Sequence, residues 1–222
     1  MIPGLFLAEF IRPHHRVLDM CAAPGNKTAQ ILENLDYDFS GKWKEGQHGG
    51  FVFANDSDGK RAHVMVHQLK RVGINRFVAT NKLAQCIPRM VGDEGNVYFD
   101  CILCDVPCSS DGTLRKSPDL WKKWKIQFGN SLHSVQLSIL IHAMHLLAAG
   151  GTIVYSTCTF NPVENEAVIS SALLFVNQFY ANTQDTKGIS TLLCSLRHDA
   201  MHEHGGKCRK LQDFQDFQCL KA

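Results

Sequence analysis

The sequence lacks any apolar run long enough to span a bilayer, and its N-terminus lacks the basic and then apolar layout of a secretory signal. The sequence also lacks a large excess of charge of either sign. The 222 residues carry a net charge of only +2, which permits a polyanionic partner without demanding one. The nine cysteines follow no small-domain spacing, so they fit an intracellular reducing compartment better than a disulfide framework. We therefore expect a globular protein with no membrane partner.

Apolar runs alternate with segments of helical periodicity along most of the chain. This pattern predicts an α/β fold, with a doubly wound, mostly parallel sheet and helices on both faces. The expected strands are Arg16–Met20, Phe51–Asn55, Phe77–Thr80, Phe99–Cys104 and Thr152–Ser156. The expected helices are Asn26–Leu35, Gly59–Val72, Ser131–Ala148 and Glu164–Asn177.

The apolar period fades near Gln178, which divides the chain into a core at 1–177 and an irregular, partly disordered polar tail at 178–222. Both ends are abrupt, so we expect a piece or an alternative product of a longer protein. Five tail residues could supply zinc ligands, but their spacing fits no familiar finger and we expect no metal. They are Cys194, His198, His202, His204 and Cys208.

The segment DMCAAPGNKT, from Asp19 to Thr28, is predicted to run from a strand through a tight turn into a helix. Small residues let a ligand approach the backbone, and Pro24 stiffens the turn. The helix N-terminus and Lys27 favour a carboxylate or phosphate. An ordinary turn with a surface lysine is the alternative, but the whole string favours a cofactor loop. Its expected binding residues are Cys21, Ala22, Ala23, Pro24, Gly25, Asn26 and Lys27.

The second expected strand ends in FANDSD. An acid at this place is well positioned for ribose hydroxyls. Asp56 is the first choice and Asp58 the second. Aspartate also favours helix N-caps, so one of the two could cap a helix while the other binds.

Two cysteines each follow an expected buried strand: Cys108 in DVPCSSDGT and Cys158 in YSTCTFNPVENE. In a doubly wound sheet the first, fourth and fifth strands are neighbours, so their ends border one crevice. A thiolate that adds to carbon 6 of cytosine makes carbon 5 nucleophilic towards an electrophilic methyl group. A second thiol could assist release of the product. The pattern therefore predicts methyl transfer with covalent catalysis.

Asp105, also at the end of the fourth strand, could stabilise charge on ring nitrogen 3 if burial keeps it protonated or sharing a proton. Cys21 is expected to shape the cofactor loop. The remaining cysteines considered are expected to be inert core residues. They are Cys86, Cys101, Cys104 and Cys194.

A basic cluster with two tryptophans follows Cys108. Its cations are Arg115, Lys116, Lys122, Lys123 and Lys125, and its aromatic residues are Trp121 and Trp124. Because the charges flank the expected site, we predict that they contact the phosphates of a nucleic acid. Tryptophan can stack on bases, but packing into the core is favoured for both. A duplex target base would have to be flipped out.

VLDMCAAPGNKT, CDVPCSSDGT and STCTFNPVENE closely resemble the Nop/Sun-type RNA cytosine-5 methyltransferases, in particular the eukaryotic members that act on tRNA. The resemblance covers roughly residues 1–177. It implies a Rossmann-like sheet that binds S-adenosylmethionine, an RNA substrate, most specifically tRNA, and a nuclear location that includes the nucleolus, with some protein in the cytoplasm. We expect a monomer.

Carried over residue by residue, the resemblance implies that Cys158 is the nucleophile and Cys108 the cysteine needed for product release. It implies that residues 21–27 form the cofactor loop and that Asp56 is the ribose-binding acid. Asp105 would serve the cofactor and the base.

The sequence departs from that family pattern at four places. Leu83 stands where an aspartate usually contacts adenine, and Ser110 stands where glycine usually follows the cysteine motif, so the turn beside Cys108 is expected to be constrained. The RNA-binding segments before the sheet are absent, and the closing strands are not recognisable after Asn177.

Two other functions are compatible with these residues. One is a catalytically inactive truncated product that binds cofactor, RNA or a protein partner. The other is a DNA cytosine-5 methyltransferase, in which Cys108 would attack. The presence of Cys158 argues against the second alternative.

Overall fold

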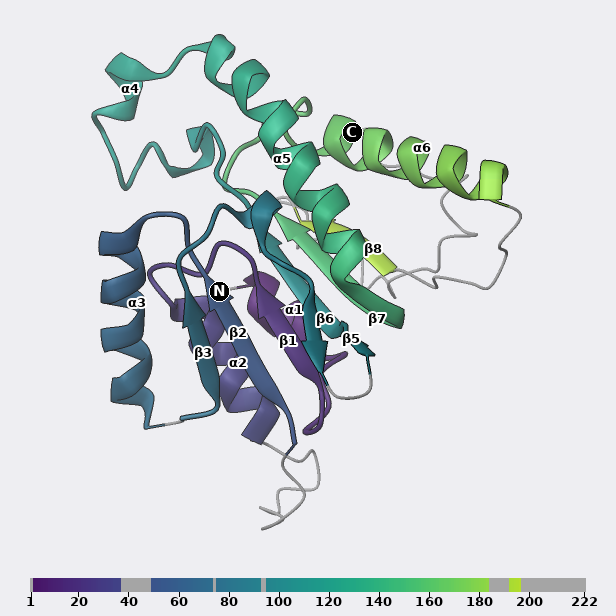
Figure 1. Cartoon of the computed structure of the whole chain (residues 1–222). Coiled ribbons are helices and arrows are strands. Elements are labelled where there is room, and N and C mark those ends of the chain that lie inside the picture. Colours follow the sequence, from purple (N-terminus) through teal and green to yellow (C-terminus); the bar gives the residue numbers. More distant parts are fainter. Residues whose placement is uncertain (1, 37–48, 74, 93–94, 184–191, 197–222) are drawn as a thin grey trace.

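A six-stranded parallel sheet organises the chain (Figure 1). The computed structural model describes residues 2–36, 49–73, 75–92, 95–183 and 192–196. The strand order is β3-β2-β1-β6-β7-β8, and every neighbouring pair is parallel. The strands are β1 (Arg16–Asp19), β2 (Phe51–Asn55), β3 (Phe77–Thr80), β6 (Phe99–Asp105), β7 (Leu147–Ser156) and β8 (Leu192–Leu196). The predicted doubly wound α/β fold is confirmed.

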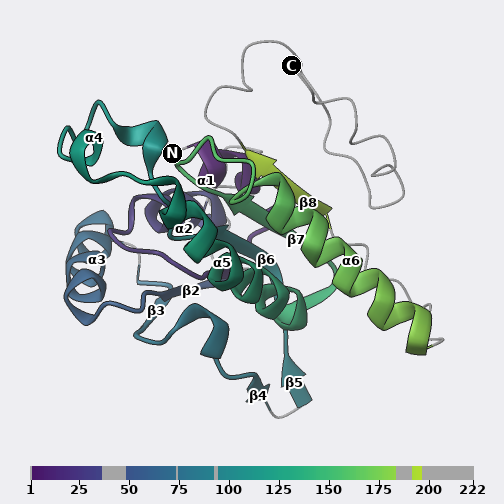
Figure 2. The ribbon, with the colours of Figure 1, turned by 90° about the horizontal axis from the view of Figure 1, so that it is seen from above.

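Helices cover both faces of this sheet (Figure 2). On one face, α1 (Ile2–Ala8), α2 (Asn26–Asp36) and α3 (Gly59–Val72) pack against the strands. On the other face lie α5 (Ile126–Leu146) and α6 (Glu166–Thr183). A parallel sheet covered in this way buries both sides of its central strands.

The central strands show why successive apolar residues form this sheet. In β6, Ile102 packs towards α5 and α6, whereas Leu103 packs towards α1 and α2, and both are fully buried. Side chains alternate between the two faces of a strand, so a strand covered twice must be apolar at adjacent positions. Val17 and Leu18 of β1 divide between the same two clusters.

The boundary between α5 and β7 differs from the sequence prediction. The helix starts at Ile126 instead of Ser131, and β7 starts at Leu147 instead of Thr152. Leu147 pairs with Phe99, and an irregularity follows before the regular pairing with β6 resumes. A Cβ on Gly151 would lie 2.8 Å from the carbonyl oxygen of Asp100, so glycine at this position permits close contact between the strands.

The segment predicted to be an irregular tail contains regular structure. Helix α6 continues to Thr183, past the expected boundary at residue 177. Strand β8 then adds to β7 in parallel, so one strand occupies the sheet edge where no closing strands were expected. Four of the possible zinc ligands, His198, His202, His204 and Cys208, lie outside the described residues.

Several short elements were not predicted. A hairpin is formed by β4 (Met90–Gly92) and β5 (Gly95–Val97), while η1 (Ala84–Cys86), η2 (Asp111–Thr113) and α4 (Leu120–Lys123) are single turns. Together with α1, these elements are too short for periodicity to reveal them. None of the helices within the described ranges is long and apolar enough to cross a bilayer.

The core prediction can be tested with a matched pair of leucines. Leu103 is fully buried in β6, whereas Leu174 is 61% exposed on α6. Leu103→Ala should lower the free energy of unfolding by about 2–5 kcal/mol, because it removes buried methyl groups and leaves a cavity. Leu174→Ala should change it by less than about 1 kcal/mol. Urea denaturation followed by circular dichroism measures both, and equal effects would contradict this description of the core.

Candidate active site

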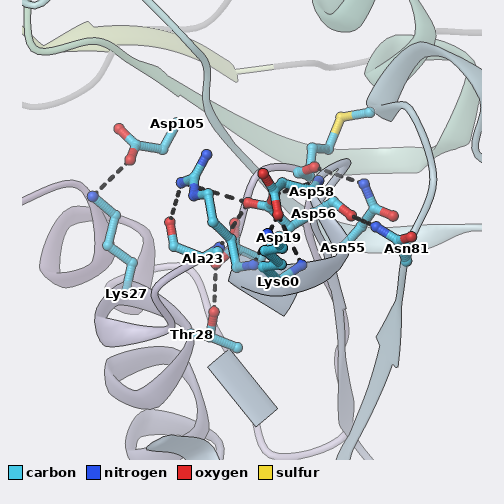
Figure 3. Close-up of polar contacts among 12 residues, drawn as sticks. Asp19, Ala23, Lys27, Thr28, Asn55, Asp56, Asp58, Lys60, Asn81 and Asp105 are labelled. Carbon is cyan, nitrogen blue, oxygen red and sulfur yellow. Dashed lines mark hydrogen bonds and ion pairs between the residues drawn. The ribbon is translucent and has the colours of Figure 1, made fainter. Parts of the chain in front are cut away.

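The loop between β1 and α2 is held by the end of β2. The N–H of Ala22 donates to the carbonyl oxygen of Asn55 at 2.7 Å, and the N–H of Ala23 donates to Oδ2 of Asp56 at 3.2 Å. Gly25 has a φ of 103°, a conformation that glycine adopts without strain. The loop predicted to bind a cofactor therefore lies against the acid predicted to bind ribose (Figure 3).

The two acids after β2 have different roles. Asp58 is the N-cap of α3, and its side chain accepts hydrogen bonds from the N–H groups of Lys60 and Arg61. Asp56 is only 2% exposed and faces the loop. Capping therefore occupies Asp58 and leaves Asp56 as the acid at the cofactor edge.

Arg61 joins this edge, although the sequence analysis did not single it out. Its Nη2 donates to the carbonyl oxygen of Ala23 at 2.8 Å and lies 3.6 Å from Oδ2 of Asp56. Its place in the first turn of α3 could have indicated this contact from the sequence, because α3 begins at the same edge of the sheet. Arg61 ties the cofactor loop to α3.

Lys27 on α2 is ion-paired with Asp105 at the end of β6, with 2.6 Å between Nζ and Oδ2. The second oxygen of Asp105 accepts a hydrogen bond from Oγ of Ser156 at 2.7 Å. Burial of Asp105 is incomplete, since its side chain is 28% exposed. Asp105 links α2 to the ends of β6 and β7.

The structure brings the two predicted cysteines into contact. Their sulfur atoms are 3.2 Å apart, and the N–H of Cys158 donates to the sulfur of Cys108 at 3.2 Å. Cys108 follows β6 and Cys158 follows β7, and these strands pair directly. The two thiols therefore lie together at the ends of adjacent strands.

Ser110 adds a hydroxyl to the thiol pair. Its Oγ lies 3.3 Å from the sulfur of Cys158 and donates to the carbonyl oxygen of Cys108 at 3.2 Å. Its backbone has a φ of 61° and a ψ of 22°, the left-handed conformation that favours glycine. The turn beside Cys108 is constrained, as its sequence predicted.

The pKa values of the two thiols are shifted in opposite directions. The pKa of Cys158 is lowered, chiefly because Cys108 donates a hydrogen bond to its sulfur, with help from Ser110 and Lys27. Burial and the charge of Asp105 oppose this effect. The pKa of Cys108 is raised, because its proton is held by Cys158 and because it is buried. Since the thiolate is the nucleophilic form, this asymmetry favours Cys158 as the nucleophile.

Burial opposes the thiolate form of three other cysteines. It raises the pKa of Cys101 to about 12, and it also raises the pKa values of Cys104 and Cys21. Cys86 is exposed, so the prediction that it is a buried core residue is wrong. The side chain of Cys194 lies outside the described residues.

The basic segment after Cys108 is largely exposed. Arg115, Lys116, Lys122 and Lys123 face solvent. Trp121 is 71% exposed, so the prediction that it packs into the core is wrong. Trp124 is partly buried, as predicted. Helix α4 is one short turn, which gives Trp121 no second layer to pack against.

Leu83 lies at the cofactor edge of β3 and is 55% exposed. The loop before it is tied to β2, because Asn55 donates to the carbonyl oxygen of Lys82 and accepts from the N–H of Lys82. The position expected to contact adenine therefore carries an exposed apolar side chain.

Asp19 is a second residue that the sequence analysis did not single out. It is 1% exposed and accepts a hydrogen bond from Oγ1 of Thr28 at 2.7 Å. Its other oxygen has no hydrogen-bond partner within the described residues. Burial raises its pKa to about 7. A buried acceptor without a donor suits a ligand that brings one.

A Rossmann-like sheet here carries a small-residue loop, an acid after the second strand and two thiols at the ends of β6 and β7. Open α/β sheets place their binding and reacting groups at this carboxyl edge. Residues 8–196 match the model of the family described as 16S rRNA methyltransferase RsmB/F. The chain belongs to this family.

Curated relatives agree with this assignment. The chain is 50% identical over 179 residues to a multisite-specific tRNA:(cytosine-C(5))-methyltransferase of Saccharomyces cerevisiae, and the match covers 78% of this chain and 25% of the relative. It is 45% identical to a tRNA (cytosine(34)-C(5))-methyltransferase of Drosophila melanogaster, over 76% of this chain and 23% of the relative. The chain therefore spans about a quarter of the length of these relatives.

Solved structures share the fold. NSun6 from Pyrococcus horikoshii, determined with SFG, has a TM-score of 0.64 and 26% identity over 78% of this chain and 41% of its own. A methyltransferase homolog protein from Pyrococcus horikoshii has a TM-score of 0.57 and 32% identity, over 77% of this chain and 48% of its own.

The residues present fit S-adenosylmethionine. This cofactor carries an ammonium group and ribose hydroxyls, both of which are donors. Asp19 offers an unpartnered buried acceptor, and Asp56 lies beside the small-residue loop. Acceptors at the ends of β1 and β2 match these donors.

Replacing Asp19 tests this match. Because burial raises its pKa from 3.8 to about 7, the folded protein holds the proton to higher pH than the unfolded chain does. Stability is therefore lost as pH rises between these two values. Asp19→Asn should unfold at a higher temperature than the parent at pH 8, and at a similar temperature near pH 3. Calorimetry should also show at least about tenfold weaker binding of S-adenosylmethionine, because a charged acceptor is lost. An unchanged melting temperature at pH 8 would contradict the predicted effect on stability. Unchanged affinity for S-adenosylmethionine would contradict the predicted role in binding.

Proposed function

We propose that this chain is the catalytic core of an S-adenosylmethionine-dependent RNA cytosine-5 methyltransferase that acts on tRNA. The single observation that carries the proposal is the 3.2 Å contact between the sulfurs of Cys108 and Cys158, at adjacent strand ends beside the cofactor loop. The relatives' names support the choice of tRNA.

In this proposal Cys158 opens the reaction. Its thiolate, favoured by the hydrogen bond from Cys108, adds to carbon 6 of the target cytosine. The new C–S bond leaves the ring electron-rich at carbon 5. When bound, S-adenosylmethionine supplies the electrophilic methyl group that carbon 5 takes up.

Cys108 assists the second half of the reaction. Carbon 5 gives up its proton to water, and the bond between carbon 6 and the sulfur of Cys158 breaks, so that the electron pair returns to sulfur. The thiol of Cys108 can donate to that departing sulfur, as it does in the free protein. Release is then general acid assistance to a leaving group.

Asp105 is assigned to orienting cofactor and base. It joins Lys27 on α2 to Ser156 on β7, so it connects the cofactor loop to the strand that Cys158 follows. Lys27 is the last residue of the cofactor segment 21–27. We assign Asp56 to the ribose and the small residues of the loop to close approach of the cofactor.

The exposed basic segment is assigned to RNA. Arg115, Lys116, Lys122 and Lys123 would neutralise phosphates, and Trp121 presents an uncovered ring for stacking. We further propose a single-stranded or flipped target base. The protein is proposed to act as a monomer in the nucleus, including the nucleolus, and in the cytoplasm.

The non-catalytic alternative has one specific observation in its favour. The chain covers only about a quarter of its relatives, so parts of their machinery lie beyond it. The DNA alternative, in which Cys108 attacks, is disfavoured by the lowered pKa of Cys158 and the raised pKa of Cys108.

Two single substitutions separate the proposed roles of the cysteines. Cys158→Ala should abolish methyl transfer to unmodified tRNA and the covalent RNA adduct, because no nucleophile remains. Cys108→Ala should also lower turnover, by at least about 100-fold for loss of the releasing group, while the adduct accumulates. Denaturing gel electrophoresis with radiolabelled tRNA measures the adduct.

The opposite outcome would identify the DNA-type mechanism: an adduct that survives Cys158→Ala and disappears in Cys108→Ala. Calorimetry of the parent chain with S-adenosylmethionine is the companion measurement. Absence of binding and of methyl transfer would support the non-catalytic alternative.

The RNA-binding assignment has its own test. The double variant Lys122→Ala/Lys123→Ala should weaken tRNA binding and reduce the slope of log affinity against log salt by about two, one for each lost phosphate contact. Filter binding at several salt concentrations measures both.

The matched control is Lys70→Ala/Arg71→Ala, which removes the same charge from the last turn of α3. If both pairs change the slope equally, binding would depend on overall charge and the assignment to the α4 segment would be wrong.

A further inference from the structure

A buried carboxylate joins the two loops that carry the cysteines. We propose that Glu164 is a positioning residue that holds the Cys108 loop (residues 106–110) against the Cys158 loop (residues 157–161). The catalytic meaning of this role rests on the proposed function, whereas the geometric role does not.

Glu164 binds the Cys108 loop through Ser109, the residue that follows Cys108. Its Oε1 accepts from the N–H of Ser109 at 2.8 Å, and its Oε2 accepts from Oγ of Ser109 at 2.6 Å. Both oxygens of the carboxylate therefore engage one residue, which fixes the direction in which the loop leaves β6.

The same carboxylate holds the Cys158 loop. Its Oε2 accepts from Oγ1 of Thr159 and from Nδ2 of Asn161, each at 3.2 Å. Ser109 and Thr159, which directly follow the two cysteines, also bond each other through their hydroxyls at 3.1 Å. The contact between the loops thus sits one residue away from the contact between the sulfurs.

Helix α5 completes the surroundings. Gln136 donates from Nε2 to Oε1 of Glu164 at 3.0 Å and to the carbonyl oxygen of Pro107 at 2.9 Å. A Cβ on Gly129 would lie 2.8 Å from Oε2 of Glu164, so the helix passes close above the carboxylate. Glu164 is fully buried, and no cation pairs with it within the described residues. Its burial is tolerable because its oxygens are hydrogen-bonded.

The neighbouring Asn165 shows that Glu164 does more than shape its own loop. Asn165 is equally buried, but its side chain bonds only Thr157, Thr159 and Asn161, all within the Cys158 loop. Asn165 therefore stabilises the Cys158 loop through contacts within that loop. Of these two neighbours, Glu164 is the one whose side chain bonds the Cys108 loop within the described residues.

The separation of the sulfurs depends on this junction. If the loops part, Cys108 can no longer donate to Cys158, and the largest influence that lowers the pKa of Cys158 is lost. Ser110 lies on the same loop as Cys108, so its hydrogen bond with Cys158 would be lost as well. Lys27 would still favour the thiolate, and burial and Asp105 would still oppose it. Loss of Glu164 should therefore make Cys158 less reactive, although Cys158 itself is unchanged.

The test measures thiol reactivity in the full chain without RNA or cofactor. The rate of Cys158 alkylation by iodoacetamide is followed from pH 5 to pH 9 by peptide mass spectrometry. In Glu164→Gln the midpoint should rise, and the rate at acid pH should fall about tenfold for each unit of that rise. Glu33→Gln, a change of the same charge at an exposed site on α2, should leave the profile unchanged.

Ser109→Ala is the second variant, chosen because it removes two hydroxyl contacts at the junction and keeps the buried acid. It should raise the midpoint in the same direction, which keeps the test decisive if Glu164→Gln does not fold by circular dichroism. An unchanged midpoint in a folded Glu164→Gln, or in Ser109→Ala where the first variant does not fold, would overturn the proposal. Methyl transfer by the parent is scored separately, so the proposed function and the role of Glu164 can fail independently.

Discussion

The pairing of β6 with β7 is the constraint on which the candidate site depends. The two strands run in parallel and in register at their ends, where Asp105 lies opposite Ser156. The chain leaves both strands at the same edge, so Cys108 and Cys158 follow at nearly equal height. A one-residue slip of a strand turns its side chains to the other face. The register of β6 and β7 therefore determines whether the two sulfur atoms can lie close together. The loops that follow the strands then set the final distance between the sulfurs.

The same edge concentrates negative charge. Asp19, Asp56 and Asp105 end or follow β1, β2 and β6, and the last two each face a cation, from Arg61 and Lys27. Asp19 forms no ion pair within the described residues, and burial raises its pKa although Lys27 opposes this effect. An edge of this kind disfavours anionic ligands near β1 and favours a cationic one. This electrostatic pattern distinguishes a positively charged methyl donor from the dinucleotides that bind related sheets through their phosphates.

The sequence alone was sufficient for features that depend on local pattern. Strand order and the two strand-end cysteines follow from periodicity and from general rules for parallel sheets, and α3 has the predicted bounds because Asp58 and Gly73 cap it. Glu164 could not be found in this way. In NPVENE it resembles a solvated residue at a helix start, and its partners Ser109 and Gln136 lie far away in the sequence. Long-range hydrogen bonds leave no trace in periodicity.

Ser110 illustrates how local strain and chemistry are combined at the site. A non-glycine residue in the left-handed conformation costs about 1–2 kcal/mol. Glycine would remove that cost, but it would also remove the hydroxyl 3.3 Å from the sulfur of Cys158. The neighbouring Gly112 cannot carry a side chain, since a Cβ there would lie 2.7 Å from the carbonyl oxygen of Cys158. The turn therefore places the hydroxyl of Ser110 where it reaches the thiol pair, whereas Gly112 leaves room for the closest approach to the carbonyl oxygen of Cys158.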